Sequence, residues 1–309
     1  MSGIDLINHA LDMVRPEKTK KMKITNKMNL PEALVKLVTI EKHNKENHLS
    51  ATTLLNGVKQ IILTERYWEQ LEDDVSDRIW AIWGTAIHSL LEHEGEKEFT
   101  EETLKYEIDG ITITGKIDNY NMEHGILTDY KTCSIWKIKF NNFDDWKMQG
   151  SVYSWLLHKN GFKINKCRFI ALIKDHSKKD AKREFPYPES PVYIYEFNVT
   201  EKLLEETEIF IKEKIYSFIE CIELEDDDIP PCTPEERWDK PTKYAVMKEG
   251  RKTAIRVFES FEEAEALLKV LDMKHFIETR KGESVRCQDY CLCNQYCDYY
   301  KEISKREEL

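Results

Sequence analysis

The sequence lacks the long apolar segments that membrane insertion and secretion require. It has no run of about eighteen apolar residues, the length that a membrane-spanning helix needs. Residues 1–20 contain acids and no long apolar core, which does not fit a signal peptide. We therefore expect no membrane partner and a cytoplasmic location.

Cations are also in short supply, with 46 Lys and Arg against 57 Asp and Glu, for a formal net charge of −11. This balance disfavours long, non-specific contact with nucleic acid, because Lys and Arg dominate phosphate binding. Local cations gather at residues 137–147 and 174–183. A catalytic metal would add further positive charge, so an acidic nuclease remains open. No base-reading Arg pair stands out, and sequence preference is not expected.

The apolar spacing divides the chain into three parts. These are an N-terminal helical segment (1–48), a core (49–225) and a C-terminal subdomain with a cysteine cluster (226–309). In the first part we expect helices at 4–14 and 31–43, joined by a solvated Lys-rich linker at 18–27. Residues 50–94 have helical spacing, and residues 103–109, 111–120 and 126–132 predict a three-stranded antiparallel meander with a turn at Asp109-Gly110. Further on we expect a helix at 143–159, strands at 167–173 and 192–199, and a helix at 200–222.

An Asp-x-Lys pair on the expected strand 125–132 is the most informative feature. The period of two places Asp129 and Lys131 on one face, and Asp118 ends the preceding strand. Two carboxylates can hold a hard divalent cation, and an amine beside them can orient water or offset phosphate charge. A surface salt bridge explains an isolated Asp-x-Lys equally well, so the surrounding motifs matter.

Four motifs occur in order over residues 50–199, and together they resemble the PD-(D/E)XK nuclease superfamily. They are Gly84-Thr-Ala-Ile-His88, Gly115-Lys-Ile-Asp118, Asp129-Tyr-Lys131 and Gln149-x-x-x-Tyr153. The resemblance is to the RecB-like branch, which includes CRISPR-associated iron-sulfur exonucleases and their phage-encoded relatives. It implies an α/β fold of the α+β type, with a restriction-endonuclease-like core whose central mixed sheet is flanked by helices.

The resemblance also implies roles for the residues of these motifs. Asp118 and Asp129 would be carboxylate metal ligands, with His88 as a third ligand and the Tyr130 backbone carbonyl completing the set. Lys131 would position or activate the attacking water. Mg²⁺ or Mn²⁺ is the expected ion, because oxygen ligands suit hard cations and a histidine leans towards Mn²⁺.

The same resemblance implies DNA, single-stranded or with free ends, as the substrate. Gln149 and Tyr153, one helical turn apart, would contact it. The expected activity is a Mg/Mn-dependent deoxyribonuclease, an exonuclease releasing 5′-phosphate products in phage or bacterial DNA recombination, repair or processing. A homo-oligomer or recombination partner proteins are compatible with this role.

Some of these residues have a structural explanation as well. His88 lies among apolar residues and could be a satisfied core histidine. Glu107 could be an extra ligand, although a cross-strand partner is the favoured reading. Three cysteines outside the cluster fit strand or helix patterns and are expected to be small buried hydrophobes: Cys133, Cys167 and Cys221.

Four cysteines near the C terminus indicate a metal site in a reducing compartment. Cys287, Cys291, Cys293 and Cys297 are separated by three, one and three residues, unlike the CxxC pairs of common zinc ribbons. Cys291 and Cys293 would diverge in an extended chain, so we expect that one of the four is not a ligand. Cys232 begins the segment that ends at Cys287, and the intervening hairpin and helix could bring both ends together.

The related iron-sulfur nucleases hold a [4Fe-4S] cluster with one distant cysteine and a C-terminal trio. The trio that fits this plan is Cys287, Cys291 and Cys297. No cysteine occurs where relatives place the distant one, soon after residue 50. We expect Cys232 as the substitute, with Cys293 as the alternative, in a structural role. A Zn²⁺ site with the same thiolates remains open.

Two further classes of function remain alongside the nuclease. The first is a catalytically silent nuclease fold that binds DNA ends or a partner protein. The second is a zinc-dependent RNA- or protein-binding factor, which leaves the arrangement of Asp118, Asp129 and Lys131 unexplained.

Overall fold

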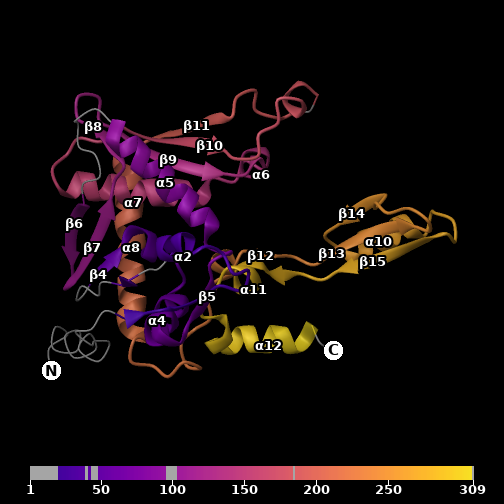
Figure 1. Ribbon diagram of the computed structural model, residues 1–309. Coiled ribbons are helices and arrows are strands. Elements are labelled where there is room, and N and C mark those ends of the chain that lie inside the picture. The colour runs from indigo at the N-terminus through magenta and orange to yellow at the C-terminus, as the bar shows by residue number, and fades with distance from the viewer. Residues whose placement is uncertain (1–19, 39–40, 43–47, 95–102, 184, 308–309) are drawn as a thin grey trace. The chain divides into compact units, whose positions relative to one another are not determined.

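The computed structural model describes residues 20–38, 41–42, 48–94, 103–183 and 185–307 (Figure 1). The chain forms two compact units, Met1–Glu225 and Asp226–Leu309. The helix expected at residues 4–14 lies outside the described residues. In the described part of the chain, no helix is both long and apolar enough to cross a membrane.

The larger unit contains a four-stranded mixed sheet, which we call the central sheet. Its order is β11-β10-β9-β8, with β8 (Asn119–Asn121), β9 (Ile126–Cys133), β10 (Lys166–Ile173) and β11 (Val192–Asn198). β9 runs parallel to β10, whereas β8 and β11 run antiparallel to their neighbours. Alternate residues of β10 are buried, as the period of two predicts. The prediction of a mixed α+β fold is confirmed.

A second sheet, in the order β4-β7-β6, corrects the predicted meander. It contains β4 (His48–Ser50), β6 (Thr103–Ile108) and β7 (Ile111–Lys116). The predicted turn is present, because Asp109 and Gly110 both have positive φ, as a tight hairpin of this type requires. After β7 the chain leaves this sheet through the buried Ile117, and β8 pairs with β9 instead. Periodicity found these strands but assigned β9 to the wrong sheet.

The larger unit also contains helices, some of which pack against its sheets and others against one another. They are α2 (Glu32–Val38), α3 (Ala51–Leu54), α4 (Val58–Arg66), α5 (Ile79–Glu94), α6 (Ile135–Lys139), α7 (Asp144–Lys159) and α8 (Glu201–Cys221), with 3₁₀ turns η1 (Trp68–Gln70) and η2 (Asp180–Lys182). α7 packs against β6, β7, β9, β10 and α8, and its middle turns are buried. Gly161, with φ +83°, follows the end of this helix, where a left-handed residue is common.

The N-terminal part differs from the prediction. The expected linker contains β1 (Lys20–Lys21) and β2 (Lys23–Thr25), which pair with β3 (Glu41–Lys42) and β5 (Glu72–Asp74). β5 also interrupts the helical pattern of residues 50–94. The Asp74 carboxylate accepts hydrogen bonds from the Thr25 hydroxyl and the Lys27 N–H at 2.7 and 2.9 Å. Polar contacts between residues far apart in the sequence produce no hydrophobic periodicity, so the sequence does not predict them.

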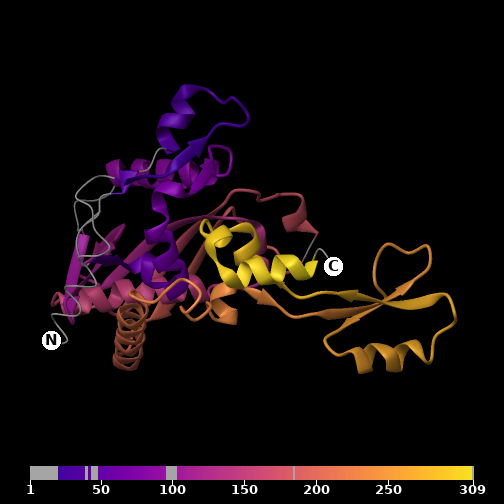
Figure 2. The ribbon, with the colours of Figure 1, turned by 90° about the horizontal axis from the view of Figure 1, so that it is seen from below.

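The smaller unit contains two sheets. Their strands are β12 (Asp239–Lys240) with β16 (Glu283–Ser284), and β14 (Arg256–Phe258), β13 (Lys243–Lys248) and β15 (His275–Arg280). The helices are α9 (Pro234–Arg237), α10 (Phe261–Leu268), α11 (Val285–Asp289) and α12 (Asp298–Glu307), with the 3₁₀ turn η3 (Asn294–Tyr296). α10 lies along the three-stranded sheet (Figure 2). Ser260 is the N-cap of α10, since its hydroxyl accepts the Glu263 N–H.

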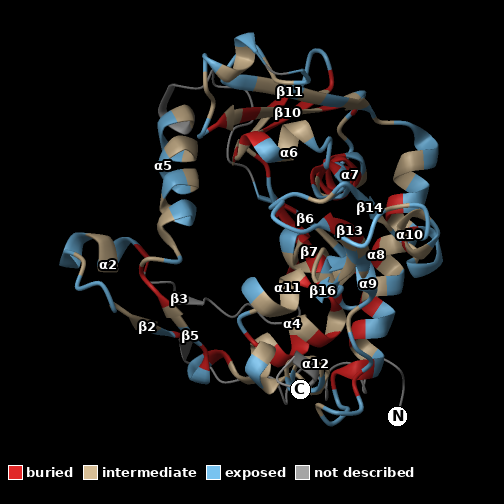
Figure 3. Cartoon of the chain, turned by 90° about the vertical axis from the view of Figure 1, so that its right-hand side faces the viewer, coloured by how far each residue is buried: buried red, intermediate tan, exposed pale blue. Residues whose placement is uncertain are grey.

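Buried residues gather in α7 and in the strands beneath it (Figure 3). Gly150 lets α7 lie close to β10, because an added Cβ would lie 2.6 Å from Cys167 Sγ on that strand. The core therefore supports β9, the strand that carries Asp129.

Candidate functional site

Asp118 connects α5 to the central sheet. Its Oδ1 lies 3.2 Å from His88 Nδ1, and its Oδ2 accepts the Tyr130 N–H at 2.8 Å. Both side chains of the ion pair are largely shielded from solvent. The hydrogen bond with Asp118 raises the pKa of His88, and burial opposes this rise. The structure thus brings three of the predicted site positions together.

Asp129 and Lys131 extend from the same face of β9, as the strand period predicts. Lys131 Nζ lies 2.7 Å from Asp129 Oδ2, and the Asp129 side chain is only 4% exposed. Burial raises the pKa of Asp129 to about 6; the Lys131 charge lowers it and the Asp118 charge raises it further. The charge of Asp118 acts on Asp129, so the two carboxylates lie near each other.

The Lys131 ammonium is the close partner of the buried Asp129 carboxylate. The Lys131 ammonium also lies 5.7 Å from the centroid of the Phe169 ring. Burial of a carboxylate costs free energy that its ammonium partner offsets, and a bound cation would offset more of this cost.

Gln149 and Tyr153 lie on α7, with Gln149 Nε2 donating to Tyr153 Oη at 3.0 Å. Tyr153 is buried and Gln149 is half-buried. Burial raises the pKa of Tyr153 to about 12, and the charges of Asp129 and Asp118 add to this rise. Tyr153 therefore lies close to the carboxylates, within the protein interior.

Gly115, which belongs to the second motif, has a packing role in the structure. A Cβ at this position would lie 2.7 Å from Leu156 Cδ1 and 2.8 Å from Tyr153 Cδ1. The glycine lets α7 approach β7 just before the chain turns to Asp118. By contrast, Glu107 is exposed on β6 opposite Thr112, which is the cross-strand position.

The donor set of two carboxylates, an imidazole and a backbone carbonyl suits Mg²⁺ or Mn²⁺. The buried Asp129 carboxylate fits a ligand for such an ion. In the described part of the chain, no three His, Cys, Asp or Glu side chains are already grouped as a metal site. Here Asp118 contacts His88 directly, so joint metal binding would replace that contact.

The cysteines of the smaller unit lie near one another. Burial raises the pKa of Cys287 to about 12, and the nearby thiols of Cys291, Cys232 and Cys297 raise it further. Cys291 and Cys293 have their sulfurs 3.5 Å apart, and Cys293 is fully buried. A hydrogen bond with Cys293 lowers the pKa of Cys291 to about 7, against the effect of burial. The fold thus brings Cys232 to the C-terminal cysteines across some fifty intervening residues.

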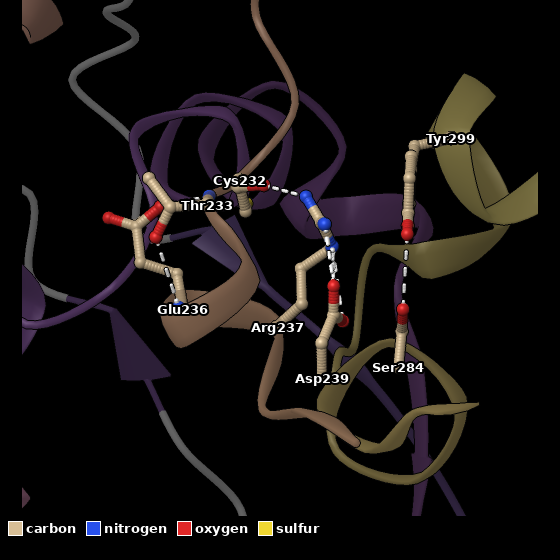
Figure 4. A network of polar contacts seen from close by, with 7 residues as sticks. All are labelled: Cys232, Thr233, Glu236, Arg237, Asp239, Ser284 and Tyr299. Atoms are coloured by element: carbon tan, nitrogen blue, oxygen red, sulfur yellow. Dashed lines mark hydrogen bonds and ion pairs between the residues drawn. The ribbon is translucent and has the colours of Figure 1, made fainter. Parts of the chain in front are cut away.

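Arg237 fixes the loop that carries Cys232 (Figure 4). It donates to the Cys232 carbonyl oxygen and pairs with Asp239 at 2.6 Å. Its guanidinium lies 4.3 Å from the centroid of the Tyr299 ring, and the Tyr299 hydroxyl lies 3.1 Å from Ser284 Oγ. Sequence reasoning missed this network, although the Arg-x-Asp spacing was visible.

The helix that follows this loop, α9, begins with a full capping box. The Thr233 hydroxyl accepts the Glu236 N–H, and the Glu236 carboxylate accepts the Thr233 N–H at 2.8 Å. The Thr-Pro-Glu-Glu segment is the sequence signal for it.

Three other cysteines are buried in the larger unit, as predicted: Cys133, Cys167 and Cys221.

Comparison with known proteins gives structural neighbours alone. No protein-family model matches the sequence, and the search of curated proteins gave no match. Among solved structures, the protein SSO0001 is similar at 18% identity, with 70% of this chain and 86% of that chain covered and a TM-score of 0.39. An alkaline exonuclease from Laribacter hongkongensis is 12% identical, with 57% and 90% covered and a TM-score of 0.38. A phage-related exonuclease from Haemophilus somnus 129PT is 13% identical, with 45% and 71% covered and a TM-score of 0.31.

Proposed function

We propose that this protein is a metal-dependent DNA nuclease whose active site contains Asp118, Asp129 and Lys131. One observation carries the proposal. Two carboxylates, an imidazole and an ammonium converge at β9, and the Asp129 side chain is only 4% exposed with the Lys131 ammonium 2.7 Å away. A surface salt bridge would instead expose both charges.

Asp118, Asp129, His88 and the Tyr130 carbonyl would hold Mg²⁺ or Mn²⁺. When bound, the ion would lower the pKa of a water molecule and polarise the phosphate. Lys131 would orient that water or offset phosphate charge from the same face of the strand. Burial around Asp129 strengthens these electrostatic effects, because few water molecules screen them.

For the finer activity we propose an exonuclease that leaves 5′-phosphate ends in phage or bacterial DNA recombination, repair or processing. The motif resemblance supports this part of the proposal. Gln149, half-buried beside Tyr153, is proposed to reach the DNA, and Tyr153 to hold Gln149 in place.

The nuclease proposal is tested by incubating the protein with free-ended and end-blocked DNA in Mn²⁺. We expect cleavage of the free-ended substrate, and a loss of roughly 10²-fold or more for Asp129→Asn and for Lys131→Met. Lys137→Met is the matched control, because Lys137 pairs with Asp145 outside the site. Full activity in both site variants would overturn the assignment.

We also propose that the smaller unit holds a [4Fe-4S] cluster that stabilises its fold. The proposed ligands are Cys232, Cys287, Cys291 and Cys297. The supporting observation is the closeness of Cys232, Cys291 and Cys297 to Cys287. Cys293 is the alternative ligand, since its sulfur lies 3.5 Å from that of Cys291. Zn²⁺ is the alternative occupant.

Anaerobic purification tests this second proposal. We expect brown protein with visible absorption, lost in Cys232→Ser and kept in Cys221→Ser, a buried cysteine on α8. Colourless protein with stoichiometric zinc would remove the iron assignment. Unchanged metal content in Cys232→Ser, together with loss of metal in Cys293→Ser, would identify Cys293 instead of Cys232 as the fourth ligand.

A catalytically silent DNA-end or partner-binding module is the second candidate. The observation that favours it is the pairing of the site residues with one another, His88 with Asp118 and Lys131 with Asp129. Retained DNA binding without cleavage in either Mg²⁺ or Mn²⁺ would support it over the nuclease.

A further inference from the structure

Two pairs of exposed aromatic side chains lie on the larger unit. On α5, Trp80 and Trp83 are 58% and 50% exposed, with ring centroids 6.5 Å apart. On α6, Trp136 and Phe140 are 53% and 73% exposed and stacked, with centroids 5.6 Å apart and planes inclined by 25°. We call these four side chains the aromatic surface. Large rings left in water are unfavourable, and a patch of them marks a contact site.

Each pair carries a lysine over one of its rings. Lys174 Nζ lies 3.6 Å from the centroid of Trp80, and Lys139 Nζ lies 4.7 Å from that of Trp136. Each ammonium group therefore lies over one face of its ring and adds a positive charge to the exposed aromatic pair. A ring that can stack on a base, next to a cation that can meet a phosphate, is how proteins hold single-stranded nucleic acid.

The two pairs lie at the same end of β9. The Lys174 N–H donates to the carbonyl of Cys133, the last residue of β9, at 3.0 Å. The next residue, Asp175, accepts the Ile135 N–H at 2.7 Å and so fixes the start of α6. A Cβ on Gly84 would lie 3.8 Å from Thr132 Oγ1, which places α5 beside the same strand end.

The aromatic surface is thus continuous with the candidate active site. Lys131 lies two residues before the end of β9, which leads into α6. His88 lies about two turns along α5 from Trp80. Figure 1 shows α5 beside β9 and α6 after the end of that strand.

We propose that the aromatic surface binds single-stranded DNA by base stacking and leads it to the candidate active site. The direction of delivery rests on the proposed nuclease function; the binding itself does not. Single-stranded DNA is favoured because its bases are free to stack, whereas duplex DNA presents stacked bases and a backbone. The cations over the rings complement its phosphates.

The test measures binding without metal, so that cleavage plays no part. Fluorescence anisotropy in EDTA would follow a labelled oligothymidine of about 16 nucleotides and a duplex of the same length. We expect Trp80→Leu and Trp136→Leu each to weaken single-strand binding about tenfold, and Trp80→Phe and Trp136→Phe to stay within about threefold. Ile209→Ala is the control, since Ile209 is 56% exposed on α8.

Leucine keeps the apolar area and removes the flat ring, so the Leu and Phe variants separate stacking from general apolar contact. Unchanged single-strand affinity in the Leu variants would overturn the proposal. A change in oligomeric state by light scattering, with DNA affinity unaffected, would also overturn it and assign the surface to self-association. If the wild-type protein cleaves no DNA in Mn²⁺ but keeps its ring-dependent binding, the nuclease function alone would be refuted.

Discussion

At the scale of single residues, the candidate site depends on how each polar atom is satisfied. The sequence places Asp129 and Lys131 on one face of a strand because side chains alternate. It cannot show that Asp118 Oδ2 would accept the Tyr130 N–H, since that contact depends on where the chain leaves β7. Residue types at the site were thus predictable, and their present pairing was not.

Removing the Asp118 carboxylate should destabilise the fold as well as the site. In Asp118→Ala, the Tyr130 N–H loses its acceptor, and we expect a loss of about 1–3 kcal/mol in the free energy of unfolding. Urea denaturation measures this loss. Asp145→Ala is the control, because Asp145 is exposed and its ion pair with Lys137 should contribute little. Equal stability of Asp118→Ala and wild type would contradict the contact.

Two motif glycines should respond to alanine in opposite directions. In Gly115→Ala the new Cβ would meet Leu156 and Tyr153 below 3.0 Å, and overpacking should cost about 1–3 kcal/mol. In Gly84→Ala the nearest atom is 3.8 Å away, and higher helix propensity should stabilise the protein by up to about 1 kcal/mol. Thermal melting of both variants checks the pair, and the same sign for both would be contrary to the packing described.

At the scale of elements, periodicity predicted α7, α8, β10 and β11 with nearly their observed bounds, because each buries one face or alternate residues. It failed for β1, β2 and β5, which are two or three residues long. It also joined β9 to the hairpin of β6 and β7. The pattern along a strand reports burial and does not identify the neighbouring strand.

Glu208 on α8 links this helix to α7, and the link should depend on pH. Its carboxylate lies 2.7 Å from Lys159 Nζ and 2.8 Å from Lys212 Nζ and accepts the Trp155 N–H. Hydrogen bonds from Lys159 and then Lys212 lower its pKa from 4.5 to about 2. The stabilisation is complete above pH 4.5, and it is lost as the pH falls from 4.5 towards 2.

We expect Glu208→Gln to be less stable than wild type at neutral pH and to lose less stability between pH 4.5 and 2. Urea unfolding across this range gives the comparison. Glu206→Gln is the control, because Glu206 pairs with Lys202 on the exposed face of the same helix. Parallel curves for wild type and Glu208→Gln would refute this role of Glu208.

At the scale of the whole molecule, the chain forms two units that differ in how the sequence specifies them. The larger unit has a buried core that its apolar pattern largely predicts. In the smaller unit, the contacts around Cys232 involve Arg237, Asp239 and Tyr299, which come from three elements. In the sequence, the cysteines alone indicated that these segments come together.

Loss of the proposed cluster should therefore affect the smaller unit first. After oxidative bleaching or chelation, we expect trypsin to cleave rapidly within residues 226–309 while the larger unit resists. Mass spectrometry of the fragments locates the cuts. Equal protection of the smaller unit with and without its metal would argue against this stabilising role.

The central claim is that the buried carboxylate Asp129 supports metal-dependent cleavage of DNA. The most direct measurement is the cleavage rate of free-ended DNA in Mn²⁺ by wild type and by Asp129→Asn, with both shown to be folded by circular dichroism. The account predicts cleavage by wild type that EDTA stops, and a rate at least roughly 10²-fold lower for Asp129→Asn. Equal cleavage by both proteins, or no cleavage by folded wild type in either Mn²⁺ or Mg²⁺, would contradict it.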